Sequence, residues 1–567
     1  MNTIYRNILA AFTIFAAVSC YKDLGSYDYE EINEIVITTD TYTYPLGVSS
    51  TITIEPVVTQ TLVQGTDNLA YEWKLQSGTS WEVVGDGPVY ELKIGPEDVQ
   101  PYSFIFSVTD TGIGITTYAE ITVNPVSAFD QSWFILQNVG GQAVLGSVGG
   151  EGDVDERAVS PVLEDVSLSG TPRFLGIHPY MNLGVPTSPD YVPLLGVFTS
   201  SDRYILNGFT MLPQSQLTYD RIVYGSKYAG EQNMPSSAGE PQIMKGQRNG
   251  FAIVAGGIVW YAVPDQYALM YPVKLSSVQA DMFDYEAGDI CLSYASGFTF
   301  LMYDARGGRF LFYDSVDDYG IGQNDRIEIV NSGGTADNLY LTGTANNQNT
   351  LMQIADRIGS PNVFDPNSIP SGYIVDNMAV STGNRHTNNV LALGHVGNTF
   401  HIYEFCMAAI TGKSTDANCS GYWEVGIQGS VDTEGKIPAA TSRNFTRQFF
   451  YAAGNGIYRV DLTLSDPAPV LIWSSDNAAD VITGLKFKSD NEDVAYDDEN
   501  GEYQQKGITS DLGAIVRHSD GSCDLVEFQM TSGGEIEMDD EREYVIRTFT
   551  GFTDVVDFVF SYREYIR

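Results

Sequence analysis

The chain has 567 residues, of which 43% are hydrophobic and 12% aromatic, so it is long enough to bury the cores of two or more domains. Its 30 Lys and Arg residues stand against 72 Asp and Glu residues, which gives a formal net charge of −42 at pH 7. A surface this acidic repels phosphate backbones and anionic lipid heads. The charge therefore disfavours nucleic acid and anionic polysaccharides as partners.

The N-terminus has the layout of an export signal. Arg6 precedes an apolar run over residues 8–18, which is too short to cross a bilayer as a helix. Small residues lie just before Cys20, where a signal peptidase requires them, so Cys20 is predicted to carry lipid. The sequence predicts a signal peptide over 1–19 and a lipidated polar tether over 20–33. A plain secretory signal with a chance cysteine is the alternative.

Residues 34–125 contain six short runs in which apolar and polar residues alternate, such as Tyr-Ser-Phe-Ile-Phe-Ser-Val-Thr-Asp over 102–110. Period-2 alternation of Val, Ile, Thr and Tyr predicts half-buried strands. The segment Asp-Thr-Gly-Ile-Gly over 110–114 predicts a hairpin turn between the last two runs. Six or seven strands in so short a segment predict an immunoglobulin-like β-sandwich, with Trp73 as its core tryptophan.

Several motifs of this segment carry a family resemblance. Tyr71-Glu-Trp73 in mid-domain and Phe-Ile-Phe-Ser-Val-Thr-Asp-Thr over 104–111 resemble PKD-like immunoglobulin folds. With Cys20-Tyr-Lys-Asp23 and the acidic segment 28–34, the chain is similar to PKD-like family surface lipoproteins of gut Bacteroidetes. The resemblance covers the signal, the tether and the first domain. It implies an accessory of SusC/SusD-type, TonB-dependent nutrient importers and supplies no catalytic residues.

Residues 128–567 contain recurrent hairpin-like units, each an apolar strand, a Gly-rich turn and a second strand. Gly454-Asn455-Gly456 is a strong hairpin signal, because primed turns need positive φ. The recurrence is close to the spacing of propeller blades and predicts a β-propeller. We expect seven blades, with six or eight as alternatives. The apolar run over 554–561 is predicted to complete the first blade and close the ring.

The sequence contains no motif that fixes a catalytic centre. HExxH, Cys-x-x-Cys, a P-loop and a nucleophile elbow are all absent, and the chain has only five histidines. We therefore predict no catalytic residue and no cofactor, and we favour a protein that is not an enzyme. Because 72 acidic residues could include a facing carboxylate pair, a propeller-based glycoside hydrolase or lyase stays open as the alternative.

Cysteine, histidine and acidic residues supply candidates for local sites. Cys406 and Cys419 flank a polar loop and are a possible disulfide in an oxidising compartment, whereas Cys291 and Cys523 are predicted to be buried small hydrophobes. His395 and His401 flank a hairpin turn and could face each other, with His386 nearby in sequence, but ordinary strand histidines are favoured over a zinc site. The best calcium candidate is the acidic run Asp497, Asp498 and Glu499, for which solvated turns are the default interpretation.

Aromatic residues in Gly- and Asn-rich segments are the candidates for ligand binding. Tyrosine has a flat apolar face and a polar edge, which suits stacking on sugar rings or holding peptides. The candidates are Tyr180, Tyr191, Tyr219, Tyr224 and Tyr228. The alternative is that many of these side chains fill strand faces.

Taken together, these features predict a lipid-anchored outer-membrane protein that faces the cell exterior. We expect the propeller to capture a neutral or cationic glycan or peptide for a SusC/SusD-type importer, or to dock onto that importer. A structural accessory without its own ligand is a second alternative to the enzyme.

Overall fold

A computed structural model describes residues between 32 and 561. The segments outside the description are 47–48, 96–97, 99, 128, 130, 150–153, 156–167, 183–190, 214–222, 225–238, 248–249, 263–274, 278, 281–283, 293–298, 315–349, 358, 385–386, 411–413, 489–493, 498–501, 506–510 and 540. The chain divides into two compact units. The first comprises Met1–Tyr44, Ser50–Ile94 and Gln100–Pro125, and the second comprises Pro45–Ser49, Gly95–Val99 and Val126–Arg567.

The first unit is an antiparallel β-sandwich. Its strands are β1 (Ile35–Thr38), β2 (Tyr42–Pro45), β3 (Ser50–Ile54), β4 (Val57–Gln60), β5 (Leu69–Ser77), β6 (Ser80–Gly85), β7 (Tyr90–Ile94), β8 (Tyr102–Asp110) and β9 (Thr116–Val126). One sheet has the order β2-β9-β8-β5-β6, and the pairs β1-β4 and β3-β7 form the remaining ladders. Burial alternates along β8, as the period-2 pattern predicted, because one face of the strand meets the core and the other meets solvent.

Trp73 is the centre of the sandwich core. It is fully buried, and its ring centroid lies 4.3 Å from that of Phe106 and 5.6 Å from that of Tyr90. Its indole Nε1 donates a hydrogen bond of 2.8 Å to the carbonyl of Gly87, so the one polar atom of the side chain is paired. The predicted role of Trp73 as the core tryptophan is confirmed.

The second unit is built from seven blades within the described residues, two of which are joined in one eight-stranded sheet. Each blade is named by its innermost strand. The strands are β13 (Pro172–Asn182), β14 (Tyr191–Thr199) and β15 (Arg203–Asn207); β17 (Pro241–Gln247), β18 (Gly250–Ala255), β19 (Ile258–Ala262) and β20 (Leu275–Ser277); β22 (Ala287–Leu292), β23 (Thr299–Asp304), β24 (Arg309–Asp314) and β25 (Thr350–Gln353); β26 (Ile374–Asn384), β27 (Thr387–Val396), β28 (Thr399–Cys406) and β29 (Cys419–Gly426). The remaining blades are β30 (Ala439–Ala440), β31 (Gln448–Ala453), β32 (Gly456–Asp461) and β33 (Val470–Ser474); β34 (Val481–Phe487), β37 (Leu512–Arg517), β38 (Ser522–Phe528) and β39 (Ile546–Thr553); and β40 (Val555–Ser561), β10 (Ser132–Val139), β11 (Gln142–Val148) and β12 (Val154–Asp155).

Short additional elements decorate these blades. β16 (Val223–Tyr224) pairs with β20, β21 (Gln279–Ala280) pairs with β25, and β35 (Val494–Asp497) forms a hairpin with β36 (Glu502–Gln505). The helix among the described residues is the single turn α5 (Met407–Ile410). In that part of the chain, no helix has the length and apolar character needed to cross a bilayer.

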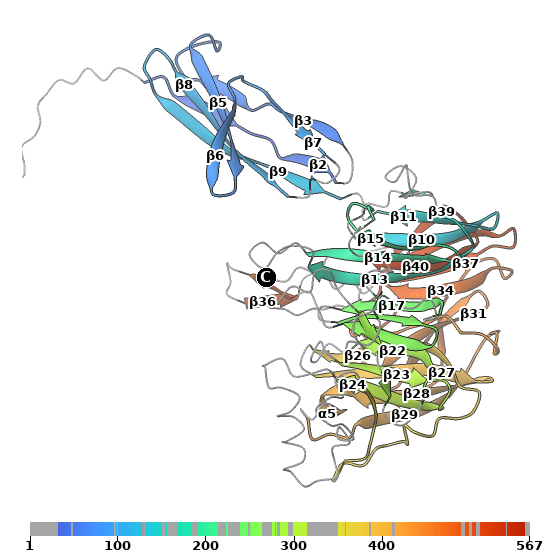
Figure 1. Cartoon of the computed structure of the whole chain (residues 1–567). Coiled ribbons are helices and arrows are strands. Elements are labelled where there is room, and N and C mark those ends of the chain that lie inside the picture. The colour runs from blue at the N-terminus through green and yellow to red at the C-terminus, as the bar shows by residue number, and fades with distance from the viewer. Residues whose placement is uncertain are drawn as a thin grey trace, which may run out of the picture. The chain divides into compact units, whose positions relative to one another are not determined.

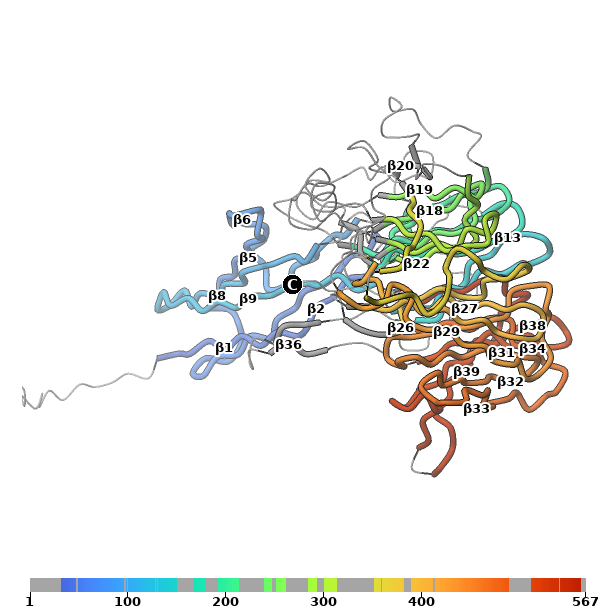
Figure 2. Tube along the Cα trace, turned by 90° about the horizontal axis from the view of Figure 1, so that it is seen from below, coloured from blue at the N-terminus to red at the C-terminus, as the bar shows by residue number. Residues whose placement is uncertain are grey.

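The seven innermost strands form a closed ring. Each contacts the next in the order β13, β17, β22, β26, β30, β34 and β40, and β40 contacts β13 again. Figure 1 shows β40 beside β10, and the two strands are paired antiparallel from Ser132↔Ser561 to Gln137↔Val555. Figure 2 follows the intervening blades in chain order, from green at β18 through yellow at β27 to orange at β31. The structure confirms a propeller closed by its C-terminal strand, and it has the seven blades that we expected.

Each junction between neighbouring blades has its own apolar core, so seven clusters hold the ring together. In β18, Phe251 and Ile253 pack toward the β13 blade, whereas Ala252 and Val254 pack toward the β22 blade. Because both faces of such a strand are buried, its sequence is a continuous apolar run instead of an alternating one. Each large apolar side chain buried in this way contributes about 1.5–3 kcal/mol.

The turns that connect these strands follow local sequence signals. β31 and β32 pair up to Ala453↔Gly456, and the turn between them consists of Gly454 and Asn455. Gly454 has a φ of 57°, a left-handed conformation that costs glycine little because it has no Cβ. The hairpin predicted at this position is confirmed.

Candidate functional site

The seven innermost strands of the propeller surround a cavity of about 500 Å³. Its lining mixes small and apolar residues, such as Gly176, Cys291 and Ala379, with charged ones. The volume falls within the range of about 300–1,000 Å³ that is typical of small-molecule sites. Because every blade contributes to the wall, the cavity exists only when the ring is closed.

A β-bulge recurs near the start of the innermost strands and determines which side chains enter the cavity wall. In six blades one residue has no partner on the neighbouring strand, namely Arg173, Gln242, Gly288, Asp376, Thr483 and Val556. A bulge bends its strand and re-aims the side chains that follow. The repetition places residues at equivalent positions in different blades.

Two of these equivalent positions form the same Lys–Asp pair across two blade junctions. Lys245 and Lys486 each lie three residues after a bulge, and Asp289 and Asp557 each lie directly after the bulge of the following blade. Lys245 Nζ lies 3.0 Å from Asp289 Oδ1, and Lys486 Nζ lies 2.6 Å from Asp557 Oδ1. Burial disfavours ionisation of Asp289, but the nearby ammonium groups outweigh it and hold the pKa of Asp289 below its usual value.

A buried Asp–His pair supports a third junction. Asp376 Oδ2 lies 2.8 Å from His395 Nδ1, and Asp376 Oδ1 accepts a hydrogen bond of 2.7 Å from the backbone N–H of Ile437. Burial raises the pKa of Asp376. Burial opposes protonation of His395, but the hydrogen bond and charge of Asp376, together with Thr433 and Asp432, outweigh it and raise the pKa of His395. Both side chains are fully buried, so the pair joins β26 to the segment before β30, and Asp376 lies in the cavity wall with its carboxylate already paired.

Lys436 and Lys488 complete the cationic part of the cavity lining. Lys488 Nζ lies 2.8 Å from Glu527 and 3.2 Å from Asp511. Lys436 is exposed, and the described residues provide it with no ion pair. The lining therefore contains four lysines but only two acidic residues, Asp376 and Asp557, in a chain where acids outnumber bases.

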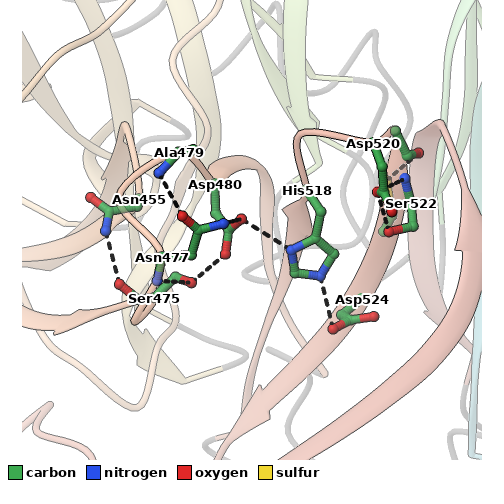
Figure 3. Close-up of polar contacts among 11 residues, drawn as sticks. Asn455, Ser475, Asn477, Ala479, Asp480, His518, Asp520, Ser522 and Asp524 are labelled. Atoms are coloured by element: carbon green, nitrogen blue, oxygen red, sulfur yellow. Dashed lines mark hydrogen bonds and ion pairs between the residues drawn. The ribbon is translucent and has the colours of Figure 1, made fainter.

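A second polar cluster lies outside the cavity lining, at the β37–β38 turn. Figure 3 shows His518 between two carboxylates, with Asp480 Oδ1 3.1 Å from Nδ1 and Asp524 Oδ2 3.0 Å from Nε2. These hydrogen bonds, first that to Asp524, raise the pKa of His518. Ser475 donates to Asp480 and not to the histidine. Both ring nitrogens are paired with carboxylates, and no hydroxyl or thiol of a described residue is bonded to them. The cluster therefore links the start of β34 to the β37–β38 turn and lacks the geometry of a Ser–His–Asp triad.

The predicted disulfide between Cys406 and Cys419 does not form, and both thiols are free and buried. Cys419 pairs with Phe405 across β28 and β29 and shares its apolar cluster. Cys406, one residue further along β28, contacts Ala408 and Ala409 in a different cluster. Neighbouring residues of a strand point to opposite faces, so the two sulfurs lie on opposite sides of the blade. Cys291 and Cys523 are buried, as predicted.

His395 and His401 do not face each other. His395 pairs in register with Phe400 and His401 with Gly394, so the two imidazoles point to opposite faces of the β26 blade. His401 Nδ1 instead lies 2.8 Å from the hydroxyl of Tyr422, and His386 lies outside the described residues. The described segments contain no group of three or more His, Cys, Asp or Glu side chains that could hold a metal ion.

Several predicted site residues fall wholly or partly outside the description. Cys20, Asp498, Glu499, Tyr219 and Tyr228 are not described. For four others only the strand is described, Asp497 being in β35, Tyr180 in β13, Tyr191 in β14 and Tyr224 in β16. The side chains of the five tyrosine candidates are therefore not described, and their role in ligand binding stays a prediction.

The lysines and aspartates of the cavity were missed at the sequence level. A signal was present, because an aspartate interrupts otherwise apolar runs in Gly-Asp289-Ile, Val-Asp376-Asn and Val-Asp557-Phe. A lone acid inside an apolar strand indicates a buried partner. The partner cannot be assigned from the pattern, since Lys245 and Asp289 lie in different blades.

The solved structures that match this chain have low identity to it and low TM-scores. A quinoprotein alcohol dehydrogenase-like protein from Bacteroides thetaiotaomicron VPI-5482 is 10% identical with a TM-score of 0.40, and the alignment covers 94% of this chain and 100% of that protein. AztD from Citrobacter koseri is 10% identical with a TM-score of 0.31, covering 88% and 100%. The WD40 domain of SCAP from fission yeast is 9% identical with a TM-score of 0.26, covering 75% of each chain.

No curated protein matches the sequence significantly. A match to a known family exists for the N-terminal part of the chain. It spans 150 of the 567 residues, and the whole sandwich lies within it. Residues 20–169 match the PKD-like family, which confirms the predicted resemblance of the first domain.

Proposed function

We propose that this protein is a lipid-anchored outer-membrane protein whose propeller binds a small glycan or peptide segment in its central cavity and presents it to a SusC/SusD-type importer. The observation that carries the proposal is the cavity of about 500 Å³, walled by all seven blades and lined by both apolar and charged side chains. Such a mixture suits a ligand with apolar faces and polar groups. The predicted export signal and the predicted lipidation of Cys20 support the proposed location.

The arrangement of the acidic residues in the cavity also favours a binding role over a catalytic one. Glycoside hydrolysis needs two carboxylates that are free to act on the scissile bond. The two acids of the described lining are committed elsewhere, Asp376 to His395 and Ile437, and Asp557 to Lys486 and two backbone N–H groups. Among the described residues of the cavity, no acid is therefore left to serve as a general acid.

Filling the cavity tests the binding site. Ala379 lines the cavity from β26, so Ala379→Trp should abolish binding of glycans or peptides that the wild-type protein retains in a binding screen. Ala468→Trp, on an exposed loop, is the matched control and should bind normally. Chain length of the probes is followed in parallel. Shortened products would favour an enzyme, and equal binding by Ala379→Trp would place the site elsewhere.

Replacing Cys20 tests the location. Cys20→Ala should release the protein from membranes or trap an uncleaved precursor, because the acyl chains contribute roughly 0.8 kcal/mol of membrane affinity for each buried CH₂ group. Metabolic labelling with a fatty acid, followed by membrane fractionation, measures both effects. A variant that is still labelled and still membrane-bound would contradict lipidation at Cys20. Co-purification of an importer without any ligand would favour the structural accessory.

A further inference from the structure

We propose that the cavity selects a ligand that carries a carboxylate, which binds to Lys436 with Lys486 as a second contact. This inference rests on the proposed function, because it names the chemical class that the same cavity takes. Carboxylates occur both in glycans, as uronic acids, and in acidic peptides, so the chemistry is shared by the two ligand sources.

The residues that line the cavity include more lysines than acids, although the chain as a whole is acidic. The sequence has 30 basic against 72 acidic residues, but the cavity lining has four lysines against two aspartates. Salt screens charges beyond about 8–10 Å, so groups lining the cavity act on a bound ligand more strongly than the distant surface. Acids outside the lining compensate two of these lysines, Asp289 at Lys245 and Glu527 with Asp511 at Lys488. The cations that remain for a ligand in the cavity are Lys436 and Lys486.

Lys436 is the cation that the protein leaves available. It lies directly before Ile437, whose N–H binds Asp376, so it sits where the β26 and β30 strands meet the cavity. The described residues give it no ion pair, although Asp432 and Glu434 precede it in the same segment. Lys436 acts electrostatically on two buried acids, but Asp289 is paired with Lys245 and Asp376 with His395. An ammonium group without a direct carboxylate partner can form an ion pair with a carboxylate of the ligand, and no existing ion pair has to break.

Lys486 offers a second contact because its partner is already saturated. Asp557 accepts hydrogen bonds from Lys486, from the N–H of Leu175 at 2.8 Å and from the N–H of Phe558 at 2.9 Å. An ammonium has three donors, and the described residues supply one acceptor to Lys486. Its side chain keeps 40% of its surface exposed. A ligand carboxylate can therefore bind Lys486 while Asp557 remains compensated by the two backbone donors.

Paired probes distinguish the sources of the carboxylate. Calorimetric titration of the mature protein compares digalacturonate with digalactose, and triglutamate with triglutamine. We expect at least one acidic probe to bind about ten-fold or more tightly than its neutral counterpart, with an affinity that falls as salt rises. Preference for digalacturonate would identify an acidic glycan as the source, and preference for triglutamate an acidic peptide.

Single-charge variants test the residues. Lys436→Gln should weaken binding of the preferred acidic probe about ten-fold and leave its neutral counterpart unchanged. Lys93→Gln, on an exposed position of the sandwich strand β7, changes the net charge by the same amount and should have no effect. Lys486→Gln, checked for folding by circular dichroism, should give a smaller loss, because that lysine already shares its charge with Asp557.

The outcomes separate this inference from the proposed function. If neutral probes bind as well as acidic ones and Lys436→Gln has no effect, the ligand does not need a carboxylate and the inference is overturned. If Ala379→Trp abolishes binding in the same experiments, the cavity is still the binding site. If Lys436→Gln and Lys93→Gln weaken binding of the acidic probe equally, the effect comes from the net charge of the protein, and the carboxylate site at Lys436 is also overturned. Absence of binding by every probe, and by any glycan or peptide in the screen, would overturn both.

Discussion

The sandwich and the propeller bury their apolar residues in different ways. The sandwich has a core around Trp73 and strands with a solvent face, so side chains such as Val83 and Tyr118 are 62% and 67% exposed. A middle strand of a propeller blade lies between two neighbours, and both of its faces are buried. The first arrangement depends on contacts within about one hundred residues, whereas the second needs β10 to pair with β40 from the far end of the chain. Closure is therefore a property of the whole propeller and stabilises every junction.

Removing the closing strand should have the largest effect. A chain that stops after Asp554 lacks β40, its six paired residues with β10 and buried side chains such as Phe558. Each such side chain contributes about 1.5–3 kcal/mol, so the loss is comparable with a typical domain stability of about 5–15 kcal/mol. Calorimetry should show the propeller transition lost and the sandwich transition retained. An unchanged propeller transition would contradict closure by β40.

Truncating a core side chain of the sandwich should destabilise the sandwich and leave the propeller unchanged. Trp73→Ala removes a fully buried indole and should cost about 3–5 kcal/mol in the sandwich transition, with the propeller transition unchanged. Trp81→Ala, at a position that is 41% exposed, is the control and should cost less than about 1 kcal/mol. The comparison is made in thermal unfolding of the whole chain and of residues 34–125 expressed alone. Equal losses in the two variants would show that Trp73 does not organise the core.

The stability of the two units should also differ in its dependence on pH, and this difference should be smaller than the effects of the two truncations. All five histidines lie outside residues 34–125. The folded pKa of His518 is raised, so its contribution is fully present below the unfolded value of about 6.5 and is lost as pH rises through the folded value. The pKa of Asp480 is lowered by its hydrogen bond from Ser475, so its contribution appears above its ordinary value and is lost in acid.

His518→Gln should therefore destabilise the propeller by at most about 1 kcal/mol near pH 5.5, because the pair is partly exposed and screened. The difference from wild type should shrink toward pH 9, and the sandwich transition should not respond. Thermal unfolding at a series of pH values measures both. A difference that grows with pH would reverse the assignment.

Treatment with a reducing agent should have the smallest effect on the stability of the protein. The four cysteines of the described chain are free thiols in the propeller, and Cys406 and Cys419 point to opposite faces of their blade. Dithiothreitol should shift neither transition, and alkylation after unfolding should modify all four thiols without prior reduction. A loss of two reactive thiols in the untreated protein would indicate the bridge.

Local patterns predicted those features whose cause is local. Alternation in residues 102–110 predicted β8, and Gly454-Asn455-Gly456 predicted a hairpin, because each depends on the backbone and on the nearest neighbours. The disulfide between Cys406 and Cys419 was wrong because proximity in sequence does not show which face each side chain takes. The tyrosine candidates rested on residue type alone, and they stay predictions because the side chains of all five lie outside the description.

By itself, the sequence determined the all-β class, the sandwich with Trp73 at its centre and the ring of blades closed by residues 554–561, since hydrophobic periodicity and turn residues act over short distances. Only the tertiary structure decided the cavity and its chemistry. Lys245 meets Asp289, and Lys486 meets Asp557, because equivalent bulges bring consecutive blades into register, and Lys436 lacks such a partner among the described residues. These pairings join residues that are 44 and 71 positions apart, and the packing of whole blades is what brings them together.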